Sequence, residues 1–137
     1  ERESKSVDST KLTIPSTTSP LIIETAGGLL VPLNRNLLQI DQIKSWQLPV
    51  LLVARTGLGT LNHTLLSIEA LRKRDISLIG LLLNGPHHQD NPKTLTEIGD
   101  IEIIGHLPVL KQVTAKSLSE QWQKQNLSST FRRLLHK

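Results

Sequence analysis

The sequence predicts an α/β protein, built as a parallel β-sheet with helices on both faces. Short apolar runs recur along the chain, and segments with helical spacing lie between them. Apolar residues make up 37% of the sequence, but only two Trp and one Phe are aromatic. Leu, Ile and Val must therefore form the core, as they do in parallel sheets that are buried on both faces.

Four apolar runs are the predicted strands, bounded by polar or turn-forming segments. They cover residues 21–24 (LIIE), 48–54 (LPVLLVA), 76–84 (ISLIGLLLN) and 101–105 (IEIIG). The run at 48–54 contains no polar residue, which is typical of a strand that is buried on both faces.

Helices are predicted between and after these strands, where apolar residues recur every three or four positions. They cover residues 36–46, 60–74, 91–99, 114–125 and 128–136. Thr60 is the predicted N-cap of the second helix. Asn91 is the predicted N-cap of the third, with Pro92 at its first helical position and Gly99 at its end.

The domain organisation follows from a change in composition near residue 20. Residues 1–20 are rich in Ser, Thr and charged side chains, which predicts a polar lead-in or linker with a short helical turn near residues 7–12. Residues 21–137 are predicted to be part of a single domain. Strands that alternate with helices require crossovers, and these are right-handed in parallel sheets.

Ligands of open parallel sheets bind beyond the carboxyl ends of the strands. This rule predicts a functional rim made of Glu24, residues 55–62, Asn84 with Gly85, and residues 106–110. The candidate binding residues lie at these strand ends.

The composition excludes several classes of site and partner. Lys and Arg outnumber Asp and Glu by 16 to 12, but the basic clusters lie at 72–74 and 132–133, where predicted helices end. The helix dipole favours cations there, so we expect no nucleic-acid partner. Without cysteine, the chain has no disulfide, zinc–cysteine site or thiol nucleophile.

The absence of two further signals predicts the protein's location. No apolar run reaches the length of a membrane span, and the N-terminus lacks the apolar region of a signal peptide. We therefore expect a cytoplasmic protein without a membrane partner. The chain has no methionine and begins with Glu1, which predicts a piece of a longer protein.

Glu24 is a candidate ligand for a hard cation because it ends a predicted strand. Mg²⁺ prefers carboxylate oxygen and needs only one or two acids when phosphates and waters complete its shell. Gly27 and Gly28 follow and permit close approach of the backbone to a phosphate. A solvated acid at a strand end is an equally good interpretation of Glu24 alone.

The stretch RTGLGTLNH, residues 55–63, joins a predicted strand to a predicted helix. Gly57 and Gly59 can turn backbone N–H groups toward an anion, and the helix N-terminus adds a favourable dipole. A tight loop that needs glycine for geometry alone explains the spacing better, since the full G-x-G-x-x-G pattern is absent.

The remaining polar candidates are ambiguous on sequence alone. Asn84 offers an amide donor and acceptor that suit an adenine edge, but Asn before Gly85 is also ordinary turn chemistry. The histidines at 87–88 lack the spacing of metal ligands. His63 is either structural or ligand-facing, and no catalytic triad is indicated.

One expected motif of ATP-using α/β enzymes is absent. The phosphate-binding loop G-x-x-x-x-G-K-[ST] occurs nowhere, and the sequence contains no Gly-Lys pair.

Taken together, ETAGGLLVPL, LPVLLVARTGLGTLNHTLLSIEAL, GLLLNG and NPKTL resemble dethiobiotin synthetase over residues 21 to about 110. Residues 1–12 resemble the lead-in of that family. The family closes the cyclic urea of dethiobiotin on diaminopelargonic acid, using CO2 or bicarbonate and ATP with Mg²⁺.

This resemblance implies a P-loop NTPase-like α/β fold and a homodimer. The family carries its phosphate loop and catalytic lysines in its N-terminal half. The chain is therefore expected to be the C-terminal portion, with no catalytic residue of its own and no activity alone.

The resemblance also implies a nucleotide site. Glu24 matches the Mg²⁺-binding acid, Asn84 matches the adenine-recognising asparagine, and residues 108–110 match the segment along the adenine. The full set is Glu24, Thr25, Ala26, Gly27, Asn84, Gly85, Pro108, Val109 and Leu110. The family usually has glycine where Thr25 stands, and a positive φ there would strain Thr25.

A substrate site is implied by three further matches. Leu58, Gly59 and Asn62 match the loop and helix start that hold the substrate carboxylate across the dimer interface. This agrees with the anion site that the glycines suggest.

Three alternatives remain open. Amidoligases of cobalamin synthesis and partition-type ATPases share the P-loop fold but are not expected to carry GLGTLNHTLL. A non-catalytic dimerisation module fits the missing loop. Nucleic-acid binding ranks last.

Overall fold

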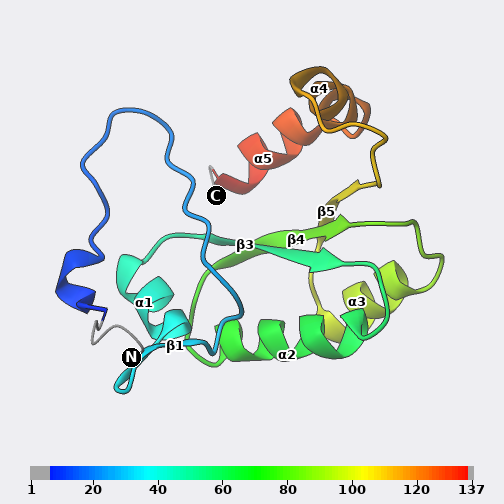
Figure 1. The fold of residues 1–137 in the computed structure, drawn as a ribbon. Helices are drawn as coiled ribbons and strands as arrows, with labels where there is room; N and C mark the ends of the chain where they lie inside the picture. The colour runs from blue at the N-terminus through cyan, green and yellow to red at the C-terminus, as the bar shows by residue number, and fades with distance from the viewer. Residues whose placement is uncertain (1–6, 136–137) are drawn as a thin grey trace.

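The computed structural model describes residues 7–135 (Figure 1). A parallel sheet is formed by three strands in the order β3 (Val50–Arg55), β4 (Leu78–Asn84) and β5 (Ile103–Leu107). The strands predicted at 48–54, 76–84 and 101–105 are thus confirmed, with ends that shift by no more than two residues.

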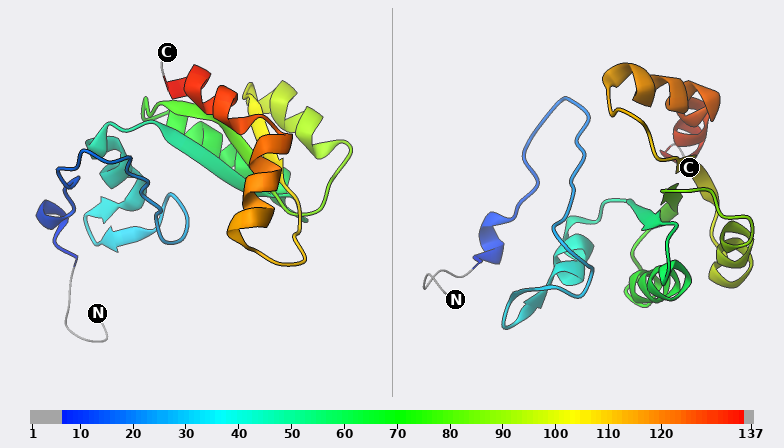
Figure 2. Two further views of the ribbon diagram at one scale, coloured as in Figure 1. Left: turned by 90° about the horizontal axis from the view of Figure 1, so that it is seen from above. Right: turned by 45° about the vertical axis from the view of Figure 1, so that its right-hand side comes forward.

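Helices lie on both faces of this sheet, as predicted. Figure 1 shows α2 (Thr60–Arg72) and α3 (Asn91–Gly99) below it, and α4 (Ala115–Lys124) and α5 (Leu127–Leu135) above it. Crossovers of one hand between neighbouring strands place α2 and α3 on the same face. Seen from above in Figure 2, α5 lies over the sheet.

The expectation that residues 48–54 are buried on both faces is wrong. Leu52 and Ala54 pack into the core between the sheet and α2, whereas Val53 is 54% exposed. Side chains alternate between the two faces of a strand, and β3 is an edge strand within the described part of the chain. No described helix covers its second face as closely as α2 covers the first.

The strand predicted at residues 21–24 is also wrong. This segment has no regular secondary structure, and Ile22 is 93% exposed. A strand requires a neighbouring strand for its N–H and C=O groups. Among the described residues none pairs with this segment, so its apolar composition alone does not form one.

A small hairpin precedes α1 (Gln39–Trp46). It consists of β1 (Pro32–Asn34) and β2 (Leu37–Leu38), which pair antiparallel. The helix predicted at 36–46 therefore begins three residues late, because Leu37 and Leu38 pair with β1 instead. The helix ends at Trp46, and its C-cap Gln47 adopts the left-handed conformation.

Two predicted helix starts are corrected. Gly59, not Thr60, is the N-cap of α2, with φ of 84°, and the Thr60 hydroxyl donates to the carbonyl of Arg55. Asn91 is the first residue of α3, behind the N-cap Asp90, and Pro92 is the second. The last two helices agree with the predicted ranges to within one residue over the described part of the chain.

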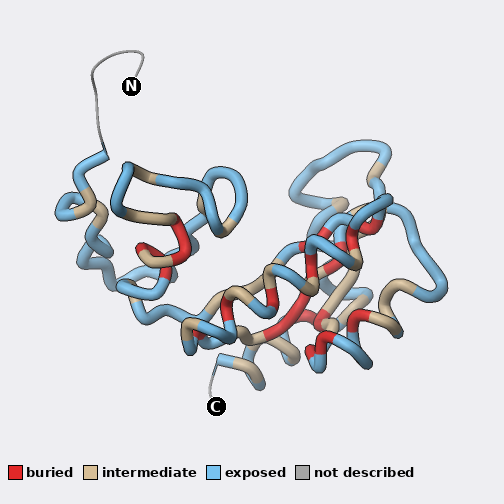
Figure 3. Tube along the Cα trace, turned by 90° about the horizontal axis from the view of Figure 1, so that it is seen from below, coloured by how far each residue is buried: buried red, intermediate tan, exposed pale blue. Residues whose placement is uncertain are grey.

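The core consists of two clusters, drawn in red in Figure 3. One lies between the sheet and helices α2 and α3, with Leu81 and Leu95 at its centre. The second joins α1 to the start of the sheet and contains Ile40, Leu71 and Ile76. Aliphatic residues form both, as the composition predicts.

The polar lead-in contains the predicted helical turn, a 3-10 helix η1 (Ser9–Lys11). It is also fastened to the hairpin and α1. Trp46 Nε1 and Gln42 Nε2 both donate to the carbonyl of Leu12, at 2.7 and 3.2 Å. Asn34 Nδ2 donates to the carbonyl of Val7 at 3.1 Å.

None of the helices in residues 7–135 combines the length and apolar character needed to span a membrane.

Candidate nucleotide and anion site

The carboxyl ends of the three strands are joined by backbone hydrogen bonds just beyond the sheet. The N–H of Thr56, after β3, donates to the carbonyl of Asn84 at 3.1 Å. The N–H of Gly85, after β4, donates to the carbonyl of Leu107 at 2.9 Å. The rim segments that follow β3, β4 and β5 therefore lie together, as the sequence predicts.

Asn84 and Gly85 form the middle of this rim. Asn84 is the last residue of β4 and its side chain is exposed, so its amide is accessible to a ligand. Gly85 has φ of 131°, and a Cβ there would lie 2.5 Å from Oγ1 of Thr56. Both the backbone conformation and the space require glycine at 85.

Thr56 is the buried polar residue of the rim. It is 8% exposed, and its hydroxyl is the one buried side-chain oxygen in residues 7–135 that has no hydrogen-bond partner. Buried hydroxyl groups are normally satisfied, and an orphaned one costs free energy. The predicted rim included this position without giving it a role.

His106 and Gln125 connect the rim to the helices above it. The ring Nε2 of His106 lies 2.8 Å from the carbonyl oxygen of Gly85, an acceptor, so this nitrogen carries the proton. The rings of His87 and His106 form an edge-to-face contact, with centroids 6.0 Å apart. Sequence reasoning missed Gln125, because a contact across 19 residues leaves no periodic signal.

Residues 108–110 continue directly from β5 and so begin beside Gly85. Pro108 and Leu110 are half-buried, whereas Val109 is 73% exposed. The structure thus brings Asn84, Gly85 and the start of residues 108–110 into one neighbourhood. These are the predicted base-binding residues.

The loop between β3 and α2 carries the predicted anion site. Of its two glycines, Gly59 has a positive φ and Gly57 does not, so only Gly59 requires glycine for its conformation. Leu58 between them is fully exposed. The first N–H groups of α2 lack intrahelical acceptors, and a helix N-terminus favours an anion.

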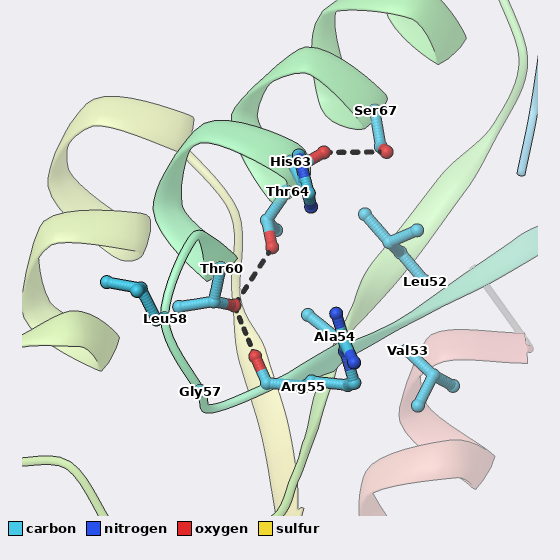
Figure 4. Close-up of a pocket in the computed structure, with 10 residues that line it drawn as sticks. All are labelled: Leu52, Val53, Ala54, Arg55, Gly57, Leu58, Thr60, His63, Thr64 and Ser67. Carbon is cyan, nitrogen blue, oxygen red and sulfur yellow. Dashed lines mark hydrogen bonds between the residues drawn. The ribbon is translucent and has the colours of Figure 1, made fainter.

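A cavity of about 170 Å³ lies between β3 and the first turns of α2. Figure 4 shows Arg55, Thr60 and His63 around it, with Val53 on its outer side. Thr60 links the strand to the helix, through its bond to Arg55 and a 3.4 Å contact with Thr64. Its lining combines a cation, hydroxyls and apolar side chains.

Asn62 lies on the first turn of α2 with an exposed side chain. His63 is exposed beside it, and its N–H donates to the carbonyl of Gly59 at 3.1 Å. Leu58, Gly59 and Asn62 are therefore neighbours on one loop and helix turn. The predicted substrate residues share an accessible surface.

The segment that follows Glu24 does not lie with these groups. Leu29, five residues later, packs with the second core cluster at the start of β3 and β4, and Gln39 Nε2 donates to the carbonyl of Gly28 at 3.0 Å. The blue segment before β1 in Figures 1 and 2 lies at this amino end of the sheet. The residues just after Glu24 are therefore held at the amino end of the sheet, and the place of Glu24 in the rim stays a prediction.

The loop that follows Glu24 shows where glycine is needed. Gly27 has φ of 82°, and a Cβ there would lie 3.1 Å from a methyl group of Val31. Thr25 is not among the residues with positive φ, so threonine is not strained at this position. Thr25 is half-buried, and Ala26 and Gly27 are exposed.

Glu24 is compatible with a Mg²⁺ ion only together with other ligands. It is an exposed carboxylate, and residues 7–135 contain no group of three His, Asp or Glu side chains placed to hold a metal. One carboxylate is enough for Mg²⁺ when phosphate oxygens and waters supply the rest. The donor set fits a metal–nucleotide complex rather than a bare ion.

Comparison with known proteins identifies the family. The profile of a family described as an AAA domain matches residues 1–117. The chain belongs to the AAA domain family. The predicted α/β, P-loop NTPase-like fold class is therefore confirmed by both the parallel sheet and the family match.

Two named enzymes have sequences similar to this chain over most of its length. The ATP-dependent dethiobiotin synthetase BioD of Rhodopseudomonas palustris (strain BisA53) is 47% identical over 118 residues, which are 86% of this chain and 55% of that protein. The synthetase of Brucella anthropi is 44% identical over 117 residues, 85% of this chain and 55% of that protein. The resemblance to dethiobiotin synthetase is thus confirmed.

A longer relative shows the same similarity. The biotin biosynthesis bifunctional protein BioCD of Bordetella avium (strain 197N) is 45% identical over 123 residues, 90% of this chain and 26% of that protein. The chain spans about half the length of the two synthetases and a quarter of the bifunctional protein.

Proposed function

We propose that this chain is the C-terminal portion of a dethiobiotin synthetase, which closes the cyclic urea of dethiobiotin from diaminopelargonic acid, CO2 and ATP. The observation that carries the proposal is the 47% identity to a named synthetase over 86% of the chain. The joined strand ends support it, because they gather the base-binding residues that the resemblance implies.

The nucleotide base binds at Asn84, Gly85 and residues 108–110. The exposed amide of Asn84 presents a donor and an acceptor, which match the Watson–Crick or Hoogsteen edge of adenine. Gly85 leaves no side chain that would block this approach. Pro108, Val109 and Leu110 supply apolar contacts along the base.

The carboxylate of diaminopelargonic acid binds at Leu58, Gly59 and Asn62. Backbone N–H groups and the dipole at the start of α2 favour the anion, and the Asn62 amide adds a further donor. The exposure of Leu58 is consistent with a site completed by the second subunit of a homodimer. Dimerisation and a cytoplasmic location are parts of this proposal.

In the complete enzyme Glu24 holds Mg²⁺ and Thr25, Ala26 and Gly27 face the phosphates, which requires the segment before β1 to reach the carboxyl end of the sheet. When bound, the metal neutralises charge on the phosphoryl group that ATP transfers to the carbamate of the substrate. The second substrate amine then attacks the carbonyl carbon of the phosphorylated carbamate, which closes the ring and releases inorganic phosphate and a proton. Lysines that stabilise this transfer in the family have no match in the chain, so the chain contributes recognition of both substrates.

Two asparagine substitutions test the assignment. Asn84→Ala should weaken ATP binding by about fivefold, since a hydrogen bond to the base is worth roughly 1 kcal/mol, while binding of diaminopelargonic acid stays unchanged. Asn62→Ala should weaken binding of diaminopelargonic acid by about ten- to a hundredfold and leave ATP unchanged, because its bond is charge-assisted. Isothermal titration calorimetry with each ligand measures both effects.

Asn36→Ala is the matched control, because Asn36 is an exposed asparagine on the β1–β2 hairpin. It should bind both ligands as the unsubstituted chain does. Parallel losses for both ligands in both site variants would show that Asn62 and Asn84 act on loop architecture and would contradict the assignment.

A further inference from the structure

The side chain of Gln125 holds both backbone groups of one residue in β5. The N–H of His106 donates to Oε1 of Gln125 at 2.7 Å, and Nε2 of Gln125 donates to the carbonyl of His106 at 2.6 Å. Both hydrogen bonds are partly buried. The primary amide thus binds His106 as the peptide group of a neighbouring strand would.

The position of β5 explains why such a contact is needed. β5 is the last strand in the order β3-β4-β5, so its outer backbone groups have no strand partner in the described part of the chain. Backbone groups that leave water need hydrogen-bond partners. Gln125 lies at the C-cap of α4, at the joint with α5, and supplies both partners from there.

The packing around this amide leaves no room for a side chain on Gly105. A Cβ on Gly105 would lie 2.9 Å from Leu127, 3.0 Å from Leu82 and 3.3 Å from Oε1 of Gln125. Leu127, the first residue of α5, is buried against the strand. The joint between α4 and α5 therefore packs against β5 at a fixed position along the strand.

From His106 the connection continues to the proposed base site. The His106 ring donates from Nε2 to the carbonyl of Gly85 at 2.8 Å. The N–H of Gly85 in turn donates to the carbonyl of Leu107 at 2.9 Å. Both polar groups of the Gly85 backbone are thus held by the residues that Gln125 positions.

We propose that Gln125 is a positioning residue for the nucleotide base, acting through His106 on Asn84, Gly85 and the start of residues 108–110. This proposal rests on the proposed function of those residues. Gln125 touches no ligand itself. It fixes the end of β5 so that the amide of Asn84 and the segment after Leu107 face the same base.

The decisive variant is Gln125→Met, which keeps the length and volume of the side chain and removes both hydrogen bonds. Gln123→Met is the matched control, because Gln123 is an exposed residue on the same helix. Hydrogen–deuterium exchange of the nucleotide-free chain should show faster exchange at residues 84–85 and 106–107 in Gln125→Met alone. Exchange in α2 should stay unchanged.

Calorimetry with two probes then separates a base defect from a general one. ATP should bind Gln125→Met about tenfold more weakly, as expected for loss of a partly buried hydrogen-bond network, while inorganic tripolyphosphate binds unchanged. Gln125→Glu retains the acceptor but loses the donor, so its ATP affinity should also fall. The control should match the unsubstituted chain with both probes.

Each contrary result has a distinct meaning. Equal ATP affinity in Gln125→Met and the unsubstituted chain, or unchanged exchange at residues 84–85, would overturn the positioning role. Faster exchange throughout the sheet would overturn it as well, because Gln125 would then be only structural. An unsubstituted chain that binds no ATP would refute the proposed function, and the exchange result would still show whether Gln125 holds Gly85.

Discussion

At two adjacent strand ends, Gly85 and Thr56 restrict which residue can stand at the other position. Gly85 must be glycine because the Thr56 hydroxyl occupies the space of a Cβ, and its φ of 131° excludes other residues. Thr56 itself has no partner for that hydroxyl within residues 7–135. The two positions are coupled, since each limits what the other can be.

The Thr56 hydroxyl without a partner leads to a prediction about the stability of the fold. Thr56→Val replaces it with a methyl group of similar size and removes the cost of a buried polar group without a partner. We expect the free energy of unfolding to rise by about 1 kcal/mol. Urea denaturation followed by circular dichroism measures the difference.

Thr60→Val is the control for this prediction, because Thr60 is buried to the same extent, 8% exposed, but donates to Arg55. It should lower the free energy of unfolding. If Thr56→Val were as destabilising as Thr60→Val, the Thr56 hydroxyl would have a partner after all.

Charged side chains add a smaller effect at the residue scale. The carboxylate of Glu102 raises the pKa of the Arg133 guanidinium, through a hydrogen bond and its charge. Hydrogen bonds from the side chain and backbone of Thr10 lower the pKa of Asp8. Because a depressed carboxylate pKa favours the folded state above the unfolded pKa, the Asp8 contribution is lost as the pH falls through the lowered value.

At the scale of elements, the lead-in behaves as part of the fold. Its carbonyl at Leu12 accepts two hydrogen bonds from α1, one of them from the half-buried indole of Trp46. A polar composition rich in Ser and Thr predicts a linker. The two donors on α1 hold this segment in place by satisfying its backbone, which composition does not reveal.

Trp46→Phe tests this attachment, because it keeps an aromatic ring and removes the indole N–H. We expect the free energy of unfolding to fall by about 1 kcal/mol, and limited proteolysis to cut residues 7–20 faster. Trp122→Phe removes an indole bond to Ser128 at the other end of the molecule and should leave cleavage of the lead-in unchanged. Equal cleavage of both variants would show that the Trp46 bond does not hold the lead-in.

The elements predicted best are those with both a periodic pattern and a local boundary signal. α3 runs from Asn91 to Gly99 as predicted, because proline and glycine punctuate it at both ends. The strand predicted at residues 21–24 is absent, because a short apolar run indicates only that burial of the segment is favourable. Whether it becomes a strand depends on a neighbour with free backbone groups.

At the scale of the whole molecule, the rim is divided. The strand ends of β3, β4 and β5 are joined by hydrogen bonds, whereas the segment that holds Glu24 lies at the opposite end of the sheet beside α1. The base and substrate residues are thus assembled without the acidic loop. The proposed base and carboxylate sites therefore use residues other than Glu24, which is proposed for Mg²⁺.

This division predicts that the 137-residue chain binds its ligands but forms no dethiobiotin alone. It contains no G-x-x-x-x-G-K-[ST] loop to neutralise the transferring phosphoryl group. Incubation with ATP, Mg²⁺, bicarbonate and diaminopelargonic acid should give no product above the level without protein. Detection of dethiobiotin by mass spectrometry at a rate proportional to chain concentration would contradict this.

The sequence by itself determined the fold class, the three strands of the sheet and the positions of the loops that follow them. These strands and the helices between them have local periodic patterns, and the three strands also find neighbours to pair with. The sequence also predicted a loop that needs glycine between β3 and α2, and the structure shows that Gly59 rather than Gly57 has the positive φ.

The side-chain contacts that hold the rim segments together could be seen only in the folded chain. The bonds from Gln125 to His106 and from His106 to Gly85 span 19 and 21 residues. Their formation depends on where the α4–α5 joint packs on β5, and no spacing in the sequence encodes that distance. The same holds for Glu24, whose place is set by the packing of Leu29 and the bond from Gln39 to Gly28, because burial and hydrogen bonding act between segments rather than along them.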